Sequence, residues 1–380
     1  MSERERRQQD PWDDNLTMAQ LDLVAARAAA DMARSELLEA LIDSGGSLLI
    51  YLPERDYYGV MLGSIESARH VAVLIPGVGT DVNLAKQWLP AARNLFDAAD
   101  GTSVILWKAY DEPADLLVAV TRTIGCDDGL RTAAAGLTEF VRSLPLSPGQ
   151  TLTLVAHSFG STVAGAALAH HGLECTDVVV AGSPGMTVDD LRQLHLDDTH
   201  FFAEEAPGDP IAGLGIFGTE PTSPVFGGTR MATNAPGHVQ VQAHSEYFAP
   251  GSESLANIVD VVTGRYDVIS AQRASLAESV GGLVAWSLRL PSMPVGVVAR
   301  HYRGPGFRVL VNIRHLADIT ANEAGNAVRE GLDSGGQAVA WIEHRISDIG
   351  GRVRARSIGD MGHGDEAGGT PSEPRSAARP

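Results

Sequence analysis

The segment TLTLVAHSFGSTVAGAAL, residues 151–168, changes from one structural pattern to another at a single serine. Residues 151–156 are a run of β-forming residues, and a helical pattern of small residues starts directly after Ser158. A nucleophile elbow, the sharp strand-to-helix turn that exposes a reactive serine, needs small residues two before and two after it. Gly160 meets this need, and Ala156 stands where the usual signature has glycine. The segment predicts such an elbow, with a serine that merely caps the helix as the alternative.

Short apolar runs alternate with helical patterns on both sides of this segment. The expected strands are 57–65, 71–75, 103–107, 151–156, 177–181 and 199–203, and the expected helices include 84–99 and 133–144. Wholly apolar strands that are each followed by a helix indicate an α/β fold with a mostly parallel central sheet and helices on both faces. Functional residues in such a sheet gather beyond the carboxyl ends of the strands.

An elbow of this kind is followed along the chain by an acid and then a histidine, each after a later strand. Asp209 lies in a Gly-Pro turn just past the strand 199–203, whereas Glu204 and Glu205 lie on or next to that strand. Asp209 is therefore the expected acid, and its alternative is an ordinary turn-forming aspartate. His244 is the first residue past an expected strand at 237–243, which makes it the expected base.

Other histidines fit this order less well. His238 is the second choice, because it opens the expected strand and would lie at the opposite edge of the sheet. The remaining candidates pack beside the serine, lie at the far end of the following helix, or precede the acid: His157, His170, His171, His195 and His200.

A loop that follows the apolar run 71–75 supplies the remaining part of the expected site. An oxyanion hole takes one N–H from the residue after the nucleophile, here Phe159, and another from such a loop. Val78 is the expected second donor, and Gly77 and Gly79 would let a substrate carbonyl approach closely. A phosphate cradle is the alternative, but the loop has neither G-x-G-x-x-G nor a Walker lysine.

Composition excludes several other classes of protein. The net charge of −18 opposes nonspecific binding to nucleic acid. Two cysteines, Cys126 and Cys175, exclude a disulfide framework and a cysteine-rich zinc site, so we expect no metal and no cofactor. Residues 1–14 are charged and lack the apolar core of a signal peptide, which indicates a cytoplasmic location.

The expected organisation has four parts: N-terminal helices over 1–56, a core over 57–264, a C-terminal helical extension over 265–358 and a disordered tail over 359–380. Helices are expected at 265–288 and 315–349. Residues 280–298 are apolar but contain Arg289, Pro291 and Pro294, which argues against a membrane span. The region 280–307 stays open as a lid or a peripheral membrane contact, and the C-terminal helices as a surface for homo-oligomer assembly.

With these residues identified, the chain resembles the α/β-hydrolase superfamily, and more closely an actinobacterial hydrolase family long catalogued as a domain of unknown function. The matching motifs are HVAVLIPGVGT at 70–80, TLTLVAHSFGS at 151–161, DVVVAGSPG at 177–185, GDP at 208–210 and AHSEYF at 243–248. The resemblance spans about residues 57–264 and implies an α/β-hydrolase fold and a triad of Ser158, His244 and Asp209. It implies no particular substrate, since one fold hosts many reactions.

The leading hypothesis is a serine hydrolase, esterase-like or lipase-like, that acts on a small-molecule or lipid-like ester, thioester or amide. Two alternatives stay open. One is a non-catalytic binding module with the same fold, and the other is an acyltransferase that uses the same three residues with an acceptor other than water.

Overall fold

A computed structural model describes residues 11–78, 84–111, 127–196, 200–207, 209, 211–212 and 215–272. All of them lie in the first of the two compact units of the chain, Met1–Arg329. The expected helices at 315–349, the segment 280–307, the tail from 359 and the substrate-loop residue Gly79 lie outside the described residues. Of the expected helix at 265–288, only the first eight residues are described, and they contain a 3₁₀ helix, Tyr266–Val268.

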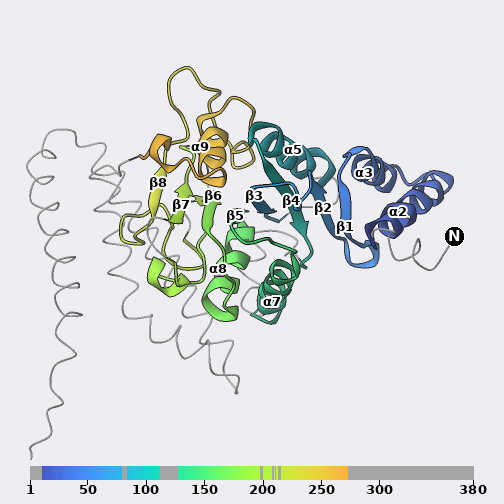
Figure 1. Cartoon of the computed structure of the whole chain (residues 1–380), viewed down its shortest axis with the longest axis horizontal. Helices are drawn as coiled ribbons and strands as arrows, with labels where there is room; N and C mark the ends of the chain where they lie inside the picture. The colour runs from blue at the N-terminus through green and yellow to red at the C-terminus, as the bar shows by residue number, and fades with distance from the viewer. Residues whose placement is uncertain are drawn as a thin grey trace, which may run out of the picture. The chain divides into compact units, whose positions relative to one another are not determined.

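An eight-stranded sheet forms the centre of the described structure (Figure 1). The strand order is β1-β2-β4-β3-β5-β6-β7-β8; β1 and β2 run antiparallel to their neighbours, and every later pairing is parallel. The strands are β1 Ser47–Leu52, β2 Tyr57–Leu62, β3 His70–Ile75, β4 Thr102–Lys108, β5 Thr151–His157, β6 Asp177–Ala181, β7 Phe201–Glu204 and β8 Thr229–Met231. The predicted mostly parallel α/β sheet is confirmed.

Successive residues of the central strands contribute to two separate cores. In β3, Ala72 and Leu74 belong to one buried cluster, and Val71, Val73 and Ile75 belong to the other. Successive side chains of a strand point to opposite faces, so a strand with helices on both faces is apolar at every position. This is why the apolar runs of β3 to β6 could be recognised from the sequence.

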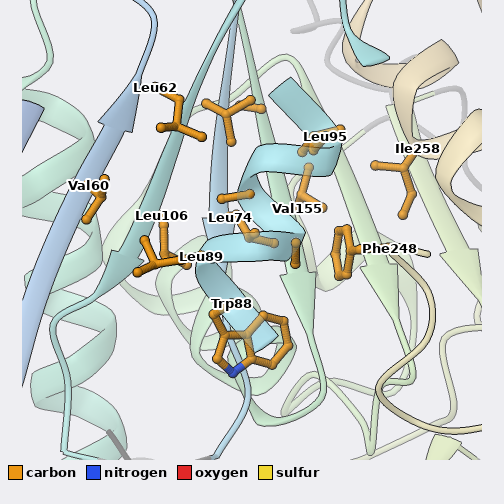
Figure 2. Packing of buried hydrophobic residues seen from close by; sticks show 14 of the residues in the cluster. Val60, Leu62, Leu74, Trp88, Leu89, Leu95, Leu106, Val155, Phe248 and Ile258 are labelled. Carbon is orange, nitrogen blue, oxygen red and sulfur yellow. The ribbon is translucent and has the colours of Figure 1, made fainter. Parts of the chain in front are cut away.

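Two pairs of helices cover the two faces of the sheet (Figure 1). Helix α5, Leu89–Ala98, and helix α9, Glu253–Val262, supply residues of the first cluster, among them Leu95 and Ile258 (Figure 2). Helix α7, Asp127–Ser143, and helix α8, Phe159–His171, supply the second. A π-helical turn, Leu84–Trp88, precedes α5, and Pro90 lies in the first turn of α5, where proline is tolerated.

The N-terminal helices were expected, but the strand that follows them was not. Helices α2, Pro11–Ala28, and α3, Met32–Asp43, form a hairpin, and the Asp31 side chain caps α3 by accepting the Arg34 N–H at 3.0 Å. Strand β1 follows and pairs antiparallel with β2 at the edge of the sheet. Its residues range irregularly from buried to exposed, so it lacks the continuous burial of the central strands.

The expected strand at 237–243 is wrong. The last strand of the sheet is β8, only three residues long, and residues 237–243 take part in a single isolated bridge, Val239 to Ser252. The N–H and C=O of Val241 instead bond to the side chain of Asn234, at 2.6 and 2.9 Å. The amide of Asn234 bonds to both main-chain groups of Val241, as a neighbouring strand would. The alternating sequence pattern of residues 237–243 is therefore present without a strand.

Among the described residues, no helix combines the length and the apolar character that crossing a membrane requires. Two further 3₁₀ turns, Pro53–Arg55 and Leu191–Leu194, complete the described elements.

Candidate active site

Ser158 lies at the sharp turn between β5 and α8, with φ 52° and ψ −130°. A positive φ is unfavourable for a residue with a side chain, and such strain persists only where the surroundings enforce it. The Ser158 N–H donates to the carbonyl of Ala181, the last residue of β6, at 3.0 Å. The serine is thus held in a strained conformation at the carboxyl end of the sheet, where the sequence placed the elbow.

The residues two before and two after Ser158 are tightly enclosed. A Cβ atom on Gly160 would overlap the main-chain carbonyls of Ile75 and Pro76, so the start of α8 lies directly against the end of β3. Ala156 is fully buried in β5 and pairs with Ile75 and Val180 of the neighbouring strands. The single extra methyl of Ala156 packs in the core, so its departure from glycine is compatible with the turn.

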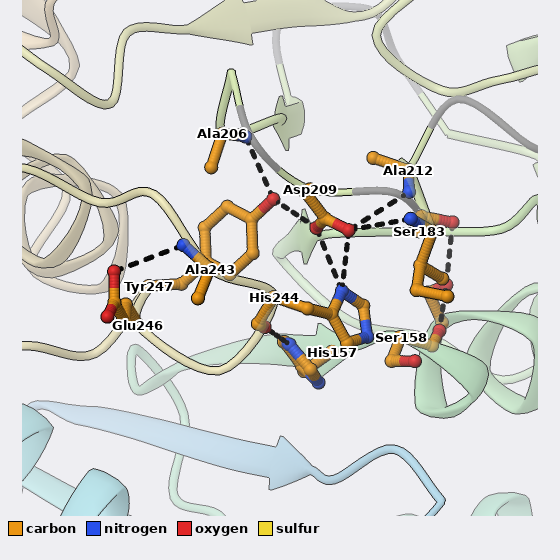
Figure 3. Close-up of polar contacts among 12 residues, drawn as sticks. His157, Ser158, Ser183, Ala206, Asp209, Ala212, Ala243, His244, Glu246 and Tyr247 are labelled. Carbon is orange, nitrogen blue, oxygen red and sulfur yellow. Dashed lines mark hydrogen bonds and ion pairs between the residues drawn. The ribbon is translucent and has the colours of Figure 1, made fainter.

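Asp209 and His244 meet beyond the carboxyl ends of the strands. The Nδ1 of His244 lies 2.8 Å from Oδ2 and 2.9 Å from Oδ1 of Asp209. The Asp209 side chain is fully buried, whereas 26% of the His244 side chain is exposed. Figure 3 shows the ring of His244 between Asp209 and Ser158, so the three expected residues come together in the expected order.

Asp209 also accepts hydrogen bonds from three further donors. The Tyr247 hydroxyl donates to Oδ2 at 2.6 Å, and the N–H groups of Ile211 and Ala212 donate to Oδ1 at 2.8 and 3.3 Å. Burial by itself raises the pKa of Asp209, but the hydrogen bond and charge of His244, together with Tyr247 and the Ile211 N–H, hold it below its ordinary value. Asp209 is therefore a turn-forming aspartate and an ionised partner of His244 at once.

Main chain from β6 closes the back of the Asp209–His244 pair. Gly182 follows β6 with φ +59°, and a Cβ atom there would lie 2.6 Å from Asp209 Oδ2 and 2.9 Å from His244 Nδ1. Glycine adopts this conformation readily and has no side chain. The side chains of Asp209 and His244 therefore pack directly against the main chain of Gly182.

The loop after β3 lies against Ser158. A Cβ on Gly77 would lie 2.6 Å from the Cβ of Ser158, and the hydroxyl of buried Tyr110 donates to the Pro76 carbonyl at 2.6 Å. Phe159 is the first residue of α8, and half-buried Val78 packs against the same hydrophobic cluster as Phe159. The two expected oxyanion donors therefore belong to the two segments that border the serine, and the positive end of the α8 dipole faces it.

The other acids near the site have different partners. Buried Glu204, the last residue of β7, accepts the Ser254 hydroxyl at 2.5 Å, and burial raises its pKa well above the ordinary value. Glu205 accepts the Thr222 hydroxyl at 3.0 Å and pairs with Arg230 at 3.5 Å.

The other histidines are also accounted for. His238 is exposed, His170 and His171 end α8, His195 follows the 3₁₀ turn Leu191–Leu194, and His200 pairs with Asp177 at 2.8 Å. His157 is buried and packs beside Ser158, as expected.

Two tyrosines that form hydrogen bonds at the candidate site were not predicted from the sequence. Tyr247 and Tyr110 each direct a buried hydroxyl at the site, at Asp209 and at the Pro76 carbonyl. Tyr247 stands only three residues after His244, inside the AHSEYF motif, so its proximity was a usable signal. Tyr110 gave no such signal, because its partner lies 34 residues away. No group of three or more His, Cys, Asp or Glu side chains in the described part of the chain is arranged to hold a metal ion.

A mostly parallel eight-stranded sheet, with a strained serine and an Asp–His pair at the carboxyl ends of its strands, defines a protein of the α/β-hydrolase fold. Residues 57–218, most of the described sheet and its helices, match the family described as Alpha/beta hydrolase.

Two relatives are proteins of Mycobacterium tuberculosis. The chain is 27% identical to uncharacterized protein Rv2079 over 294 residues, which cover 65% of this chain and 44% of the relative. It is 29% identical to uncharacterized protein Rv0963c over 229 residues, 53% of this chain and 84% of that protein. The chain thus spans less than half of the length of the first relative. Among solved structures, a protein of Thermoplasma acidophilum described as a predicted CIB-like hydrolase is similar with a TM-score of 0.38 and 15% identity, over 58% of this chain and 100% of that one.

Proposed function

We propose that this protein is a serine hydrolase that cleaves an ester, thioester or amide through Ser158, His244 and Asp209. The observation that carries the proposal is the position of the His244 ring, hydrogen-bonded to buried Asp209 at 2.8 Å on one side and facing Ser158 on the other (Figure 3). A base that is oriented by an acid and directed at a strained serine has the geometry of acyl transfer through a covalent intermediate.

The state of the histidine follows from its partner. An ionised carboxylate only accepts hydrogen bonds, so Nδ1 of His244 carries the hydrogen, and in the neutral ring that acts as the base Nε2 holds the lone pair that faces Ser158. In the proposed reaction, Nε2 takes the proton of Ser158 Oγ as Oγ attacks the acyl carbon. Asp209 then stabilises the imidazolium that forms.

The developing oxyanion would accept hydrogen bonds from the N–H groups of Phe159 and Val78. The imidazolium returns its proton to the leaving alcohol, thiol or amine, which departs and leaves an acyl-Ser158 ester. Water, deprotonated by His244, attacks this ester. The imidazolium then returns the proton to Ser158 Oγ as the acyl–Oγ bond breaks, which releases the acid product and restores the serine. The acyl substrate is small or lipid-like in this proposal.

A fluorophosphonate probe tests the proposal, because it forms a stable bond only with an activated serine. The wild-type chain should be labelled on the peptide that contains Ser158, as found by mass spectrometry, and Ser158→Ala should not be labelled. Ser143→Ala, at an exposed position that ends α7, is the matched control and should be labelled as the wild type is. Labelling of Ser158→Ala at the wild-type rate would overturn the assignment.

Turnover of a short p-nitrophenyl ester separates an enzyme from a binding module. Removal of Ser158 or His244 should lower kcat by about 10⁴-fold or more. A wild-type chain that binds the ester without releasing p-nitrophenol would contradict the proposed hydrolase activity.

A further inference from the structure

His157, the residue before Ser158, makes a contact that the reaction above does not use. His157 is only 2% exposed at the end of β5, and its Nε2 lies 2.6 Å from the main-chain carbonyl oxygen of His244. The two imidazole rings lie side by side with centroids 4.5 Å apart, and Trp88 packs on His157 at 4.9 Å (Figure 3 shows the two histidines).

The partner of Nε2 determines the tautomer of His157. A carbonyl oxygen can only accept, so Nε2 must carry the hydrogen. Burial lowers the pKa of His157 to about 3, so the ring is neutral at physiological pH and Nδ1 holds a lone pair. Nδ1 is buried without a hydrogen-bond partner. A Cβ atom on Gly77 would lie 3.3 Å from it.

This hydrogen bond joins two parts of the site that are distant in sequence. His157 is covalently bonded to Ser158, and its side chain holds the main chain of the residue that would act as base, 87 positions later. His244 belongs to a stretch without helix or strand between β8 and α9. Its side chain is held by Asp209 and its main chain by His157, so its position relative to the serine is defined from two directions.

We propose that His157 is a positioning residue, whose Nε2–H bond to the His244 carbonyl sets the distance and angle between the His244 ring and Ser158 Oγ. This inference rests on the proposed hydrolase function. A displacement of about 1 Å between reacting groups lowers rates by up to about 100-fold, so one buried hydrogen bond at this point has a measurable consequence.

Two substitutions separate the hydrogen bond from the packing. His157→Phe keeps a ring between Trp88 and His244 but removes the N–H donor. His157→Gln loses the ring but places an amide N–H at the same number of bonds from Cβ as Nε2. We expect His157→Phe to lower kcat about 10- to 100-fold with little change in KM, and His157→Gln to recover most of that loss. The rate of fluorophosphonate labelling of Ser158 should follow the same order.

Thermal unfolding of both variants identifies a purely structural role. The inference would be overturned if both variants lost kcat equally and in proportion to their losses in Tm. It would also be overturned if His157→Phe kept the wild-type kcat. A wild-type chain that the probe does not label would instead remove the proposed function, and the inference with it. ¹⁵N-histidine NMR should show a slowly exchanging Nε2–H signal of a neutral ring, absent from His157→Gln; its absence from the wild type would also refute the inference.

Discussion

Gly77 and Ser158 are in direct contact: a Cβ atom on Gly77 would lie 2.6 Å from the Cβ and 3.1 Å from the Oγ of Ser158. Gly77→Ala should therefore push the loop after β3 away from the serine and lower kcat by up to about 100-fold. Gly136→Ala is the matched control, because a Cβ on Gly136 of α7 meets nothing within 4 Å. It should keep full activity and raise the free energy of unfolding by up to about 1 kcal/mol. Equal activities of the two variants would contradict this view of the loop.

A second prediction distinguishes the two buried acids near β7. Asp209 bonds to His244, whereas Glu204 bonds to Ser254. Asp209→Asn should lower kcat by about 10⁴-fold, because the amide favours the wrong tautomer of His244. Glu204→Gln should leave kcat within about twofold of the wild type, since it keeps an acceptor for Ser254 and does not face the reacting groups. If Glu204→Gln lost kcat and Asp209→Asn did not, Glu204 and not Asp209 would be the acid that orients His244.

The same Glu204→Gln variant has a predictable effect on stability. Burial, opposed by the Ser254 hydrogen bond and reinforced by Glu253, raises the pKa of Glu204 well above its ordinary value. The folded protein then holds a proton that the unfolded chain loses above about pH 4.3, so this group lowers stability as the pH rises toward its folded pKa. Glu204→Gln should gain stability over the wild type between pH 5 and pH 8, measured by urea unfolding. A difference that does not change with pH would show that Glu204 does not titrate in this way.

Tyr247 provides a test of the environment of Asp209. Tyr247→Phe removes the hydroxyl that donates to Oδ2 and should raise the lowered pKa of Asp209 toward its ordinary value. A carboxyl with a lowered folded pKa stabilises the protein above its unfolded pKa, about 3.9, and loses that contribution as the pH falls through the folded pKa. The substitution should cost about 1–3 kcal/mol at pH 7 and less at pH 3.5. An equal cost at both values would assign the loss to the Ala206 N–H, which donates to the same hydroxyl at 2.9 Å.

Tyr110→Phe tests whether the hydrogen bond from the Tyr110 hydroxyl to the Pro76 carbonyl supports catalysis. Without the hydroxyl, the peptide before Gly77 is free to turn, and kcat should fall about tenfold with little change in KM. Tyr57→Phe removes an exposed hydroxyl that bonds to Asp111 and should leave kcat unchanged. Parallel losses in both variants would point to a general effect on the fold.

The central sheet was predictable because its strands are buried on both faces. Strand β6 has the predicted bounds, Asp177–Ala181, and β5 exceeds them by only one residue. The edges were less predictable, because β1 is only partly buried and β8 has three residues. The alternating residues at 237–243 led to the wrong strand prediction, because the pairing of Val241 with the Asn234 side chain leaves no periodic trace in the sequence.

The residues that meet at the candidate site were predictable from their order along the chain, although the strand expected directly before His244 does not form. The supporting contacts were not. The bond from His157 to the His244 carbonyl, and that from Tyr110 to the Pro76 carbonyl, link segments 87 and 34 residues apart. They depend on how the loops fold over the sheet, which local patterns do not encode.

Gly182 has a consequence for redesign of this protein. Because a side chain at this position would meet both Asp209 and His244, one wall of the site is formed by backbone and offers no position to vary. A mutagenesis library aimed at a new acyl preference should keep glycine there and diversify side chains on the opposite side of Ser158. We expect variants with a side chain at position 182 to be inactive, so leaving this position out makes the library smaller without losing active variants.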